Sequence, residues 1–318
     1  MNYALKLLGC IQWLEGLKSG LRTAWRLGVI IFPVTLVFSI VRYTPLFDAA
    51  VSGLAPVMGL FGLPGEAAVP LVLGNLLNLY AAIGAMLAMD LSVKQVFILA
   101  LMLSFSHGLP VESAVCKRIG AGFWKVTGFR IALSLVAGLL VNFLWQGGSE
   151  RASYGLVAPA AVEPEGWIEI VYSAFVSAST GVLQIAAIVI GVMFVIQILK
   201  DLGTLDLFAH ATTPLLKPLG ISSRGSVTMA GGLTFGLAFG AGVILEQARE
   251  KKFSRREITL IALFLSACHA VIEDTLIFIP LGINVLPLLV IRLIVAIALT
   301  ALIAYLWRSP QEISVNKS

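Results

Sequence analysis

One stretch of this chain occurs twice, and that duplication constrains the possible folds more than any other feature. Residues 103–113 read LSFSHGLPVES, and residues 265–275 read LSACHAVIEDT, 162 positions further on. The serine, histidine, carboxylate and hydroxyl positions coincide, so His107 matches His269 and Glu112 matches Asp274. Two of the three histidines in the chain therefore occupy one duplicated position. Self-similarity at a fixed offset predicts two structural repeats.

The match extends over most of both halves. Charged, proline and glycine residues of the first half align with residues of the same kind 158 positions further on. Four residues are inserted near 249–252, and beyond them the offset is 162. Pairs that show this are Arg42 and Lys200, Pro56 and Pro214, Gly74 and Gly232, Ser92 and Ser254, Arg130 and Arg292, and Trp145 and Trp307. We interpret the chain as an internal duplication.

Composition indicates the environment in which the repeats fold. Hydrophobic residues make up 58% of the chain and charged residues 12%, about half the charged share of a soluble domain. Together with long continuous apolar runs, this predicts an all-α polytopic membrane protein. The net charge is +5, and the basic residues lie in short loops, as they do in membrane proteins whose loop charges set the topology. We therefore do not interpret this charge as a nucleic-acid-binding surface and expect no nucleic-acid partner.

The sequence lacks the motifs of several classes of enzyme. The sequence contains no Walker motif, no HExxH and no GxSxG, so we expect neither an ATPase nor an intramembrane hydrolase, and no enzyme activity. Three dispersed cysteines, Cys10, Cys116 and Cys268, suggest no disulfide framework. We predict no cofactor and no metal site.

The predicted organisation has five parts. Residues 1–25 form an amphipathic interfacial helix, although packing of this helix on the protein's own flank explains the pattern equally well. Residues 26–146 and 168–308 are the two repeats. Residues 147–167 form an acidic extracytoplasmic linker, and residues 309–318 form a cytoplasmic tail.

Basic residues favour an inverted relation between the repeats. They follow the histidine segment in the first repeat and precede it in the second, and cytoplasmic loops collect Lys and Arg. Inversion requires an odd number of crossings per repeat, whereas each repeat has four long apolar segments. We therefore expect three spanning helices and one re-entrant helical hairpin in each, the hairpins at 66–89 and 223–246. A simple model with eight spans is the less favoured alternative. Both termini then lie in the cytoplasm, and the expected location is the bacterial cytoplasmic (inner) membrane.

The duplicated motif is the first candidate site. An ionisable residue within a membrane segment is costly and points to function. Gly108 and Pro110 are expected to break the helix between His107 and Glu112, whereas the second copy, Ala270-Val271-Ile272, is expected to stay helical. The candidate residues for substrate binding or coupling are His107, Glu112, Ser113, His269, Glu273, Asp274 and Thr275. The alternative is a structural clasp, in which histidine and carboxylate satisfy one another between helices.

The predicted hairpin tips are the second candidate site. They contribute Asn75 and Asn78 in the first repeat and Thr234 in the second, where ligand contact and tight helix packing are equally good explanations. Arg130 and Arg292 recur in both repeats, and we interpret them as anchors whose guanidinium groups reach the membrane interface.

The Gly-rich hairpins, each followed by a helix with a carboxylate-hydroxyl pair (Glu112-Ser113 and Asp274-Thr275), resemble the nucleoside-recognition or gate domain family. The resemblance covers about residues 30–146 and 180–307. That family includes the spore maturation protein pair and the membrane gates of bacterial ferrous-iron transporters, and it is distantly linked to concentrative nucleoside transporters. It implies a fold of two fused gate units, but its members handle different cargo, so the family name does not identify a nucleoside substrate.

Three functions fit this sequence. The favoured one is a secondary active transporter of a small polar solute, with a midplane site between the two repeats and possible coupling to protons. The alternatives are an ion- or metal-conducting gate and a structural or partner module that transports nothing. The expected partners are a small-molecule solute and membrane lipid, and a homo-oligomer is compatible with the sequence.

Overall fold

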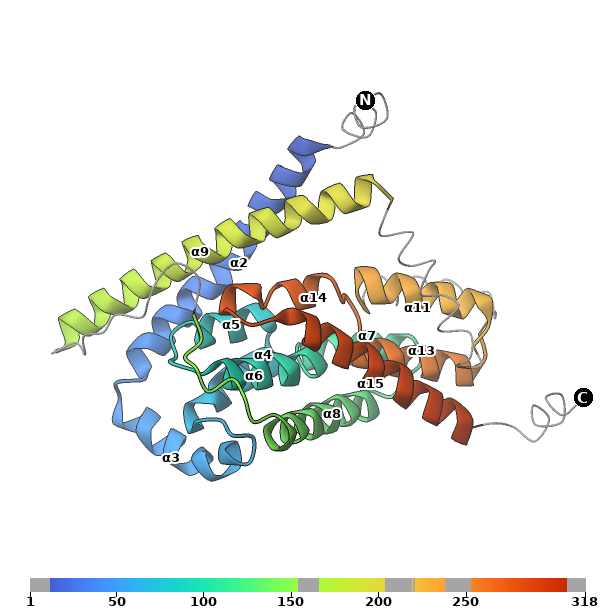
Figure 1. Ribbon diagram of the computed structural model, residues 1–318, viewed down its shortest axis with the longest axis horizontal. Helices are drawn as coiled ribbons and strands as arrows, with labels where there is room; N and C mark the ends of the chain where they lie inside the picture. The colour runs from blue at the N-terminus through green and yellow to red at the C-terminus, as the bar shows by residue number, and fades with distance from the viewer. Residues whose placement is uncertain (1–11, 154–165, 204–218, 220, 238–252, 308–318) are drawn as a thin grey trace, which may run out of the picture. The chain divides into compact units, whose positions relative to one another are not determined.

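The secondary structure is helical throughout the part of the chain that the computed structural model describes, which is residues 12–153, 166–203, 219, 221–237 and 253–307 (Figure 1). The elements in chain order are α2 (Trp13–Val41), α3 (Pro45–Gly59), η1 (Gly65–Ala67), α4 (Ala68–Leu76), α5 (Leu79–Met86), α6 (Val93–Phe105), α7 (Leu109–Arg118), α8 (Phe123–Leu144), α9 (Trp167–Asp201), α11 (Ser223–Phe235), α13 (Arg255–Ala267), α14 (Glu273–Leu276), η3 (Ile279–Leu281) and α15 (Val285–Leu306). The predicted cytoplasmic tail, the first part of the predicted interfacial helix and much of the linker lie outside these residues.

Five segments of the described chain are long and apolar enough to cross a membrane. They are Trp13–Val41, Val93–Arg118, Phe123–Leu144, Trp167–Val195 and Val285–Leu306. The predicted all-α class is confirmed for the described residues, and the five candidate spans support the prediction of a polytopic membrane protein. The sixth expected crossing, the second-repeat counterpart of Val93–Arg118, is not among them. Its helix α13 ends at Ala267, and α14 has only four residues.

The chain forms two compact units that do not coincide with the two repeats. The first unit comprises residues 1–108, 134–204 and 276–285, and the second comprises residues 109–133, 205–275 and 286–318. Each unit therefore combines segments from both halves of the sequence. The boundary falls within α8 and also between α6 and α7, at the Gly108 break.

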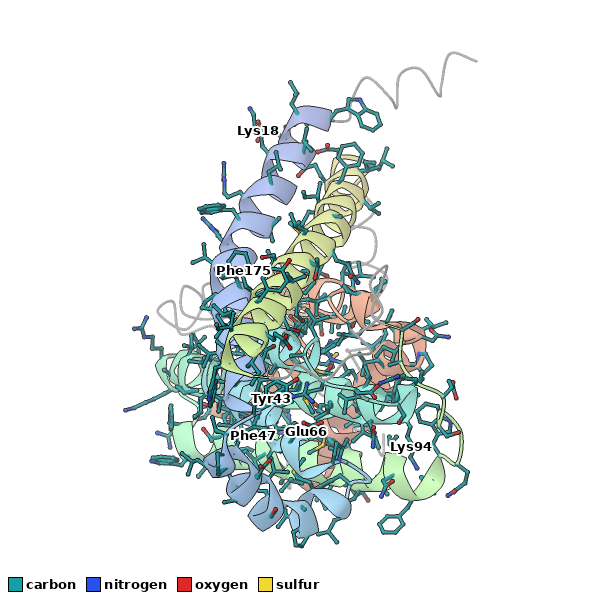
Figure 2. All side chains as sticks on the ribbon, turned by 90° about the vertical axis from the view of Figure 1, so that its left-hand side faces the viewer. Lys18, Tyr43, Phe47, Glu66, Lys94 and Phe175 are labelled. Atoms are coloured by element: carbon teal, nitrogen blue, oxygen red, sulfur yellow. The ribbon has the colours of Figure 1, made fainter. Side chains whose placement is uncertain are left out.

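Two long helices, α2 and α9, lie side by side in the first unit (Figures 1 and 2). Glycines of α2 allow the close approach, because a Cβ atom added to any of them would lie 3.0–3.2 Å from α9. The facing pairs are Gly16 with Phe194, Gly20 with Ile190 and Gly28 with Val182, so the helices run antiparallel. The rings of Phe32 on α2 and Phe175 on α9 pack edge to face, with their centroids 5.7 Å apart.

This packing corrects the prediction for the N-terminal segment. Residues 13–25 do not form a separate helix, because α2 continues without interruption to Val41. The Gly16-xxx-Gly20 spacing is a small-residue motif that brings helix backbones together in membranes. For the described part of this segment, contact with the protein's own helix is therefore the interpretation that the structure supports.

Equivalent positions in the two halves adopt the same local structure, each within its own unit. Ser92 and Ser254 begin α6 and α13 with capping boxes, in which the partner residues are Gln95 and Glu257. Lys94 donates to the carbonyl of Asn142 at 3.0 Å, and its counterpart Arg256 donates to the carbonyl of Ala304, also at 3.0 Å. These matches support the duplication that the sequence predicts.

The helix break at the first copy of the motif is confirmed. Helix α6 ends at Phe105, Gly108 has φ +52°, and α7 begins at Leu109 with Pro110 in its first turn. The Gly108 N–H donates to the carbonyl of Gly74 at 2.8 Å, so a backbone donor that the break frees is satisfied by α4.

The second copy is also broken, so the expectation that it stays helical is wrong. Helix α13 ends at Ala267, and Ala270 adopts φ +42° although it is not a glycine. The N–H groups of Ala270 and Val271 donate to the carbonyls of Gly232 and Leu233 on α11. These tertiary hydrogen bonds hold open a turn that local propensity does not favour.

The segments predicted as hairpins are short helices. In the first repeat α4 and α5 are separated by Leu77 and Asn78, and the Asn78 side chain caps α5 by accepting from the Ala81 N–H at 3.0 Å. In the second repeat α11 ends at Phe235, before Gly236 with φ +99°. Residues 238–246, the rest of the second predicted hairpin, lie outside the described residues.

Candidate functional site

The first element of the candidate site is a buried ion pair. Glu112 lies in the first turn of α7, where the helix dipole favours an acid. Its Oε2 lies 2.5 Å from Nη1 of Arg130 on α8, and the Arg130 side chain is fully buried. Both residues come from the first repeat, and both lie in the second unit.

The second repeat forms the equivalent pair. Asp274 and Arg292 lie 162 residues after Glu112 and Arg130, and Asp274 Oδ2 is 3.4 Å from Arg292 Nη2. The fully buried Arg292 side chain also donates to the Thr275 hydroxyl at 3.2 Å and to the His269 carbonyl at 2.9 Å. That carbonyl is available because α13 ends at Ala267, two residues earlier. The broken helix thus provides the acceptor that orients the guanidinium.

His269 joins the two pairs. Its Nε2 lies 3.3 Å from Glu112 Oε1 and 3.8 Å from Asp274 Oδ2. We call the resulting set Arg130, Glu112, His269, Asp274 and Arg292 the charge network. All five residues lie in the second unit, and they come from both repeats.

The hydrogen bonds of His269 have a consequence for protons. The Nδ1 atom lies 2.7 Å from the Leu265 carbonyl, which can only accept, so Nδ1 carries a proton. A neutral ring would then present a bare Nε2 to a carboxylate, which would place two acceptors in contact. The Nε2–Glu112 contact therefore requires a second proton. The ion pair with Arg130 keeps Glu112 in its charged form, and the proton is best placed on His269.

The two arginines were interpreted from the sequence as interfacial anchors, and the structure overturns that interpretation. Both side chains are fully buried, and each pairs with the acid 18 positions before it in its own repeat. That shared spacing, Glu112 to Arg130 and Asp274 to Arg292, was present in the sequence and could have indicated the pairs. A buried charge in an apolar protein interior needs such a partner.

The remaining predicted residues of the motif are distributed unevenly. Ser113 is buried and forms a hydrogen bond of 2.8 Å with the Thr127 hydroxyl of α8. Thr275 contacts the charge network, because its hydroxyl accepts a hydrogen bond from Arg292. Glu273 lies at the start of α14 with an exposed side chain.

The other predicted residues each form a hydrogen bond with a residue three or four positions away. His107 belongs to the first unit, where its Nδ1 contacts the Leu103 carbonyl at 2.8 Å, as His269 contacts Leu265 in the second. Asn78 is a helix cap, and Thr234 donates to the Ala230 carbonyl of its own helix. Asn75 donates to the Leu71 carbonyl, while its buried Oδ1 has no partner among the described residues.

Comparison with known proteins identifies the family. The model of the nucleoside recognition (Gate) family matches residues 24–130 and 182–283, which together are more than half of the chain. This chain belongs to the nucleoside recognition (Gate) family. The two matched segments begin 158 positions apart, which is the offset that aligns the two halves of the sequence. The Gate domain is thus represented twice, as the sequence resemblance implies.

A bacterial relative shares nearly the whole length. The uncharacterized membrane protein YvoD of Bacillus subtilis (strain 168) is 49% identical over 305 residues, which cover 96% of this chain and 98% of the relative. Together with the five apolar helices, this similarity establishes a membrane protein. No solved structure is significantly similar to the chain.

Proposed function

We propose that this protein is a secondary transporter that moves a small polar solute together with protons, and that proton and solute bind at the charge network. The observation that carries the proposal is the contact between His269 Nε2 and Glu112 Oε1 at 3.3 Å, which requires a proton. Histidine titrates in the physiological range, so this proton can be taken up and released. Charged groups buried within a membrane protein commonly mark proton and substrate pathways.

The break at each copy of the motif supports the same proposal. Helices interrupted within a membrane protein present backbone groups and helix ends to ions and polar solutes. The charge network includes the second break directly, because the carbonyl of His269, one residue before Ala270, accepts a hydrogen bond from Arg292. It also combines residues of both repeats, as a site formed where two repeats meet would do.

The proposed topology follows from the charge distribution of the loops. We infer inverted repeats, each with three crossings and a re-entrant pair of short helices, namely α4 and α5 in the first repeat. In this arrangement both termini are cytoplasmic and the chain lies in the bacterial cytoplasmic membrane. The break at Leu77–Asn78 and the glycine with positive φ at the end of α11 support a change of direction within the membrane.

A structural clasp is the competing explanation, and the full burial of both guanidinium groups favours it. A transport assay separates the two functions. The protein is reconstituted in vesicles that contain a pH-sensitive dye, and solutes of different chemical class are added outside at a fixed pH gradient. The transporter predicts a solute-dependent change of internal pH with the wild type.

His269→Asn is the informative variant, because it removes the titrating ring and leaves both ion pairs. We expect it to fold with nearly unchanged thermal stability and to lose the solute-dependent pH change. A clasp predicts the opposite: no solute moves protons with the wild type, and His269→Asn melts at a clearly lower temperature. His210→Asn, a histidine outside the duplicated motif, is the control and should transport normally.

A further inference from the structure

The turn between α7 and α8 lies at the membrane surface. It joins two of the candidate membrane spans, Val93–Arg118 and Phe123–Leu144, and consists of residues 119–122. Side chains at the end of one span and at the start of the next therefore lie where the hydrocarbon of the bilayer meets lipid headgroups and water. Lys117 and Arg118 occupy the end of the first span, and both are exposed.

The backbone of this turn is fixed by hydrogen bonds. Gly120 has φ +101°, and its N–H donates to the carbonyl of Lys117 at 3.1 Å. The N–H of Ala121 donates to the carbonyl of Cys116 at 3.0 Å. This pair of bonds is the Schellman motif, which closes the C-terminus of a helix. The side chains on either side of the turn thus project from a defined backbone.

The start of α8 adds an aromatic side chain and a third cation. Trp124 is 79% exposed, and its ring packs edge to face on Phe123 with centroids 5.0 Å apart. A Cβ atom added to Gly122 would lie 3.4 Å from Cγ and Cδ of Lys125, so the apolar stem of this exposed lysine lies over the turn. Tryptophan is enriched at the level of the lipid headgroups, where one part of its ring is apolar and another can be hydrated.

The second repeat contributes a fourth cation to the same surface. A Cβ atom added to Gly120 would lie 3.7 Å from Cγ2 of Ile258, so the turn packs against the beginning of α13. Arg255, the first residue of α13, is exposed, and both segments belong to the second unit. The acid beside it, Glu257, accepts from two backbone N–H groups at 2.9 and 3.0 Å. Four cations therefore lie around one acid that is already engaged in helix capping.

The helix dipoles do not explain this arrangement. Lys117 and Arg118 lie in the last turn of α7, where a cation is favourable, but Lys125 and Arg255 lie in the first turns of α8 and α13, where a cation is unfavourable. None of the four side chains forms a hydrogen bond or ion pair with another residue of the described chain. Mutual repulsion adds to the cost. An anion from outside the chain would relieve both effects.

We propose that this surface binds the headgroup of an anionic phospholipid. We call Lys117, Arg118, Trp124, Lys125 and Arg255 the basic corner. Its cations attract the lipid phosphate, and Trp124 packs beside the glycerol and the first acyl carbons. The inference goes beyond the proposed function and does not depend on transport. In the proposed topology the basic corner faces the cytoplasm.

The test measures lipid binding to the full chain in a neutral detergent. Phosphatidylglycerol or phosphatidylcholine is added, native mass spectrometry counts the lipids bound to each protein, and the melting temperature is recorded. We expect the wild type to retain phosphatidylglycerol in preference to phosphatidylcholine and to melt at a higher temperature with it. Each basic residue near a charged lipid contributes about fivefold in affinity, so Lys117→Gln/Arg118→Gln/Lys125→Gln should weaken phosphatidylglycerol binding by about 100-fold.

A matched variant controls for net charge. Lys18→Gln/Arg22→Gln/Arg26→Gln removes three exposed positive charges from α2 and should leave the preference for phosphatidylglycerol unchanged. Arg255→Gln should weaken binding by about fivefold, which tests whether the second repeat takes part. Melting temperatures in phosphatidylcholine show that the variants fold. Trp124→Ala should reduce the affinity for phosphatidylglycerol without changing the charge of the surface.

Three results would overturn the proposal. Equal binding of phosphatidylglycerol and phosphatidylcholine by the wild type would show that the surface does not select an anionic lipid. Equal losses for the variants of the basic corner and of α2 would show an effect of net charge alone. Stabilisation by soluble glycerol phosphate that equals the effect of phosphatidylglycerol would identify a site for free phosphate instead. Each of these results leaves the proposed transport function intact, because no solute or proton movement enters the measurement.

Discussion

At the scale of single residues, the two buried arginines of the charge network depend on their acidic partners. An isolated arginine in an apolar helix is usually explained by a side chain that reaches the interface. Whether it instead turns inward depends on a partner from another helix, and that contact exists only once the chain has folded. Arg130 and Arg292 are fully buried because Glu112 and Asp274 compensate them.

The first ion pair makes a prediction about stability. Glu112→Gln or Arg130→Gln alone leaves the other charge buried without its partner, and each should cost about 3–5 kcal/mol. The double variant Glu112→Gln/Arg130→Gln removes both charges and should recover most of that loss. Thermal unfolding in detergent measures the cycle, and purely additive losses would contradict the buried pair.

The second ion pair is the comparison. Arg292 also donates to the Thr275 hydroxyl and to the His269 carbonyl. The double variant Asp274→Asn/Arg292→Gln loses these hydrogen bonds as well as the charges. It should therefore recover less stability than the Glu112/Arg130 double variant.

At Ala270 we expect a substitution that stabilises the protein, in contrast to the destabilising variants of the ion pairs. Its φ of +42° lies in the left-handed region, where a residue with a Cβ atom is strained by about 1 kcal/mol relative to glycine. Ala270→Gly should raise the melting temperature, while Gly108→Ala, the reverse change at the equivalent position with φ +52°, should lower it. A lower melting temperature for Ala270→Gly would show that the turn at Ala270 is not under strain.

At the scale of the helices, the sequence predicted most elements but not the second break. Gly108 and Pro110 predict the first helix break, whereas Ala270-Val271-Ile272 contains no residue that disfavours a helix in this way. The second break is stabilised by tertiary hydrogen bonds. Carbonyl groups of α11 accept from the N–H groups of Ala270 and Val271, and Arg292 donates to the His269 carbonyl. These partners are distant in sequence, so local propensity could not show them.

The capping box of α13 has a pH dependence. Burial raises the pKa of Glu257, but hydrogen bonds from Ser254 and Ser222 outweigh this effect, so the pKa lies below its usual value of 4.5. The stabilisation is thus complete above pH 4.5 and is lost as the pH falls through the folded-state pKa. Glu257→Gln should lose roughly 0.5–1.5 kcal/mol at neutral pH and show no such dependence.

The first repeat provides the control for this prediction. Gln95 accepts from the Ser92 N–H at 2.9 Å and donates to the Gly62 carbonyl at 3.4 Å, so an amide suits that site. Gln95→Glu should be destabilising at neutral pH, the reverse of the preference at Glu257. Melting curves between pH 3.5 and 7 measure both, and equal effects of the two substitutions would contradict the assignment.

The contact of α2 with α9 predicts a position-dependent effect. A Cβ atom at Gly20 would lie 3.0 Å from the Cα atom and 3.1 Å from the carbonyl oxygen of Ile190, and the backbone cannot move aside easily. Gly20→Leu should destabilise the protein by about 1–3 kcal/mol. Gly191→Leu on α9 should be tolerated, since nothing lies within 4 Å of its added Cβ atom. Similar melting temperatures for the two variants would argue against the α2–α9 contact.

At the scale of the whole molecule, the duplication and the membrane class follow from the sequence, but the division into units does not. Matching residues such as Lys94 and Arg256 showed two repeats, and both form the predicted equivalent contacts. Each unit instead contains segments of both repeats, since residues 109–133 of the first repeat belong to the same unit as residues 205–275 of the second. This combination of segments places Glu112 in contact with His269. No pattern within one repeat contains this information.

The central claim is that the charge network holds a proton on His269, and the state of that ring can be measured directly. Protein labelled with ¹⁵N at histidine is reconstituted in lipid at neutral pH, and solid-state NMR records the ring nitrogens. The chain has three histidines, so the His269 signals are those absent from the His269→Asn variant. We expect both nitrogens to be protonated, as in an imidazolium ion. A neutral ring with a bare Nε2 would contradict the account.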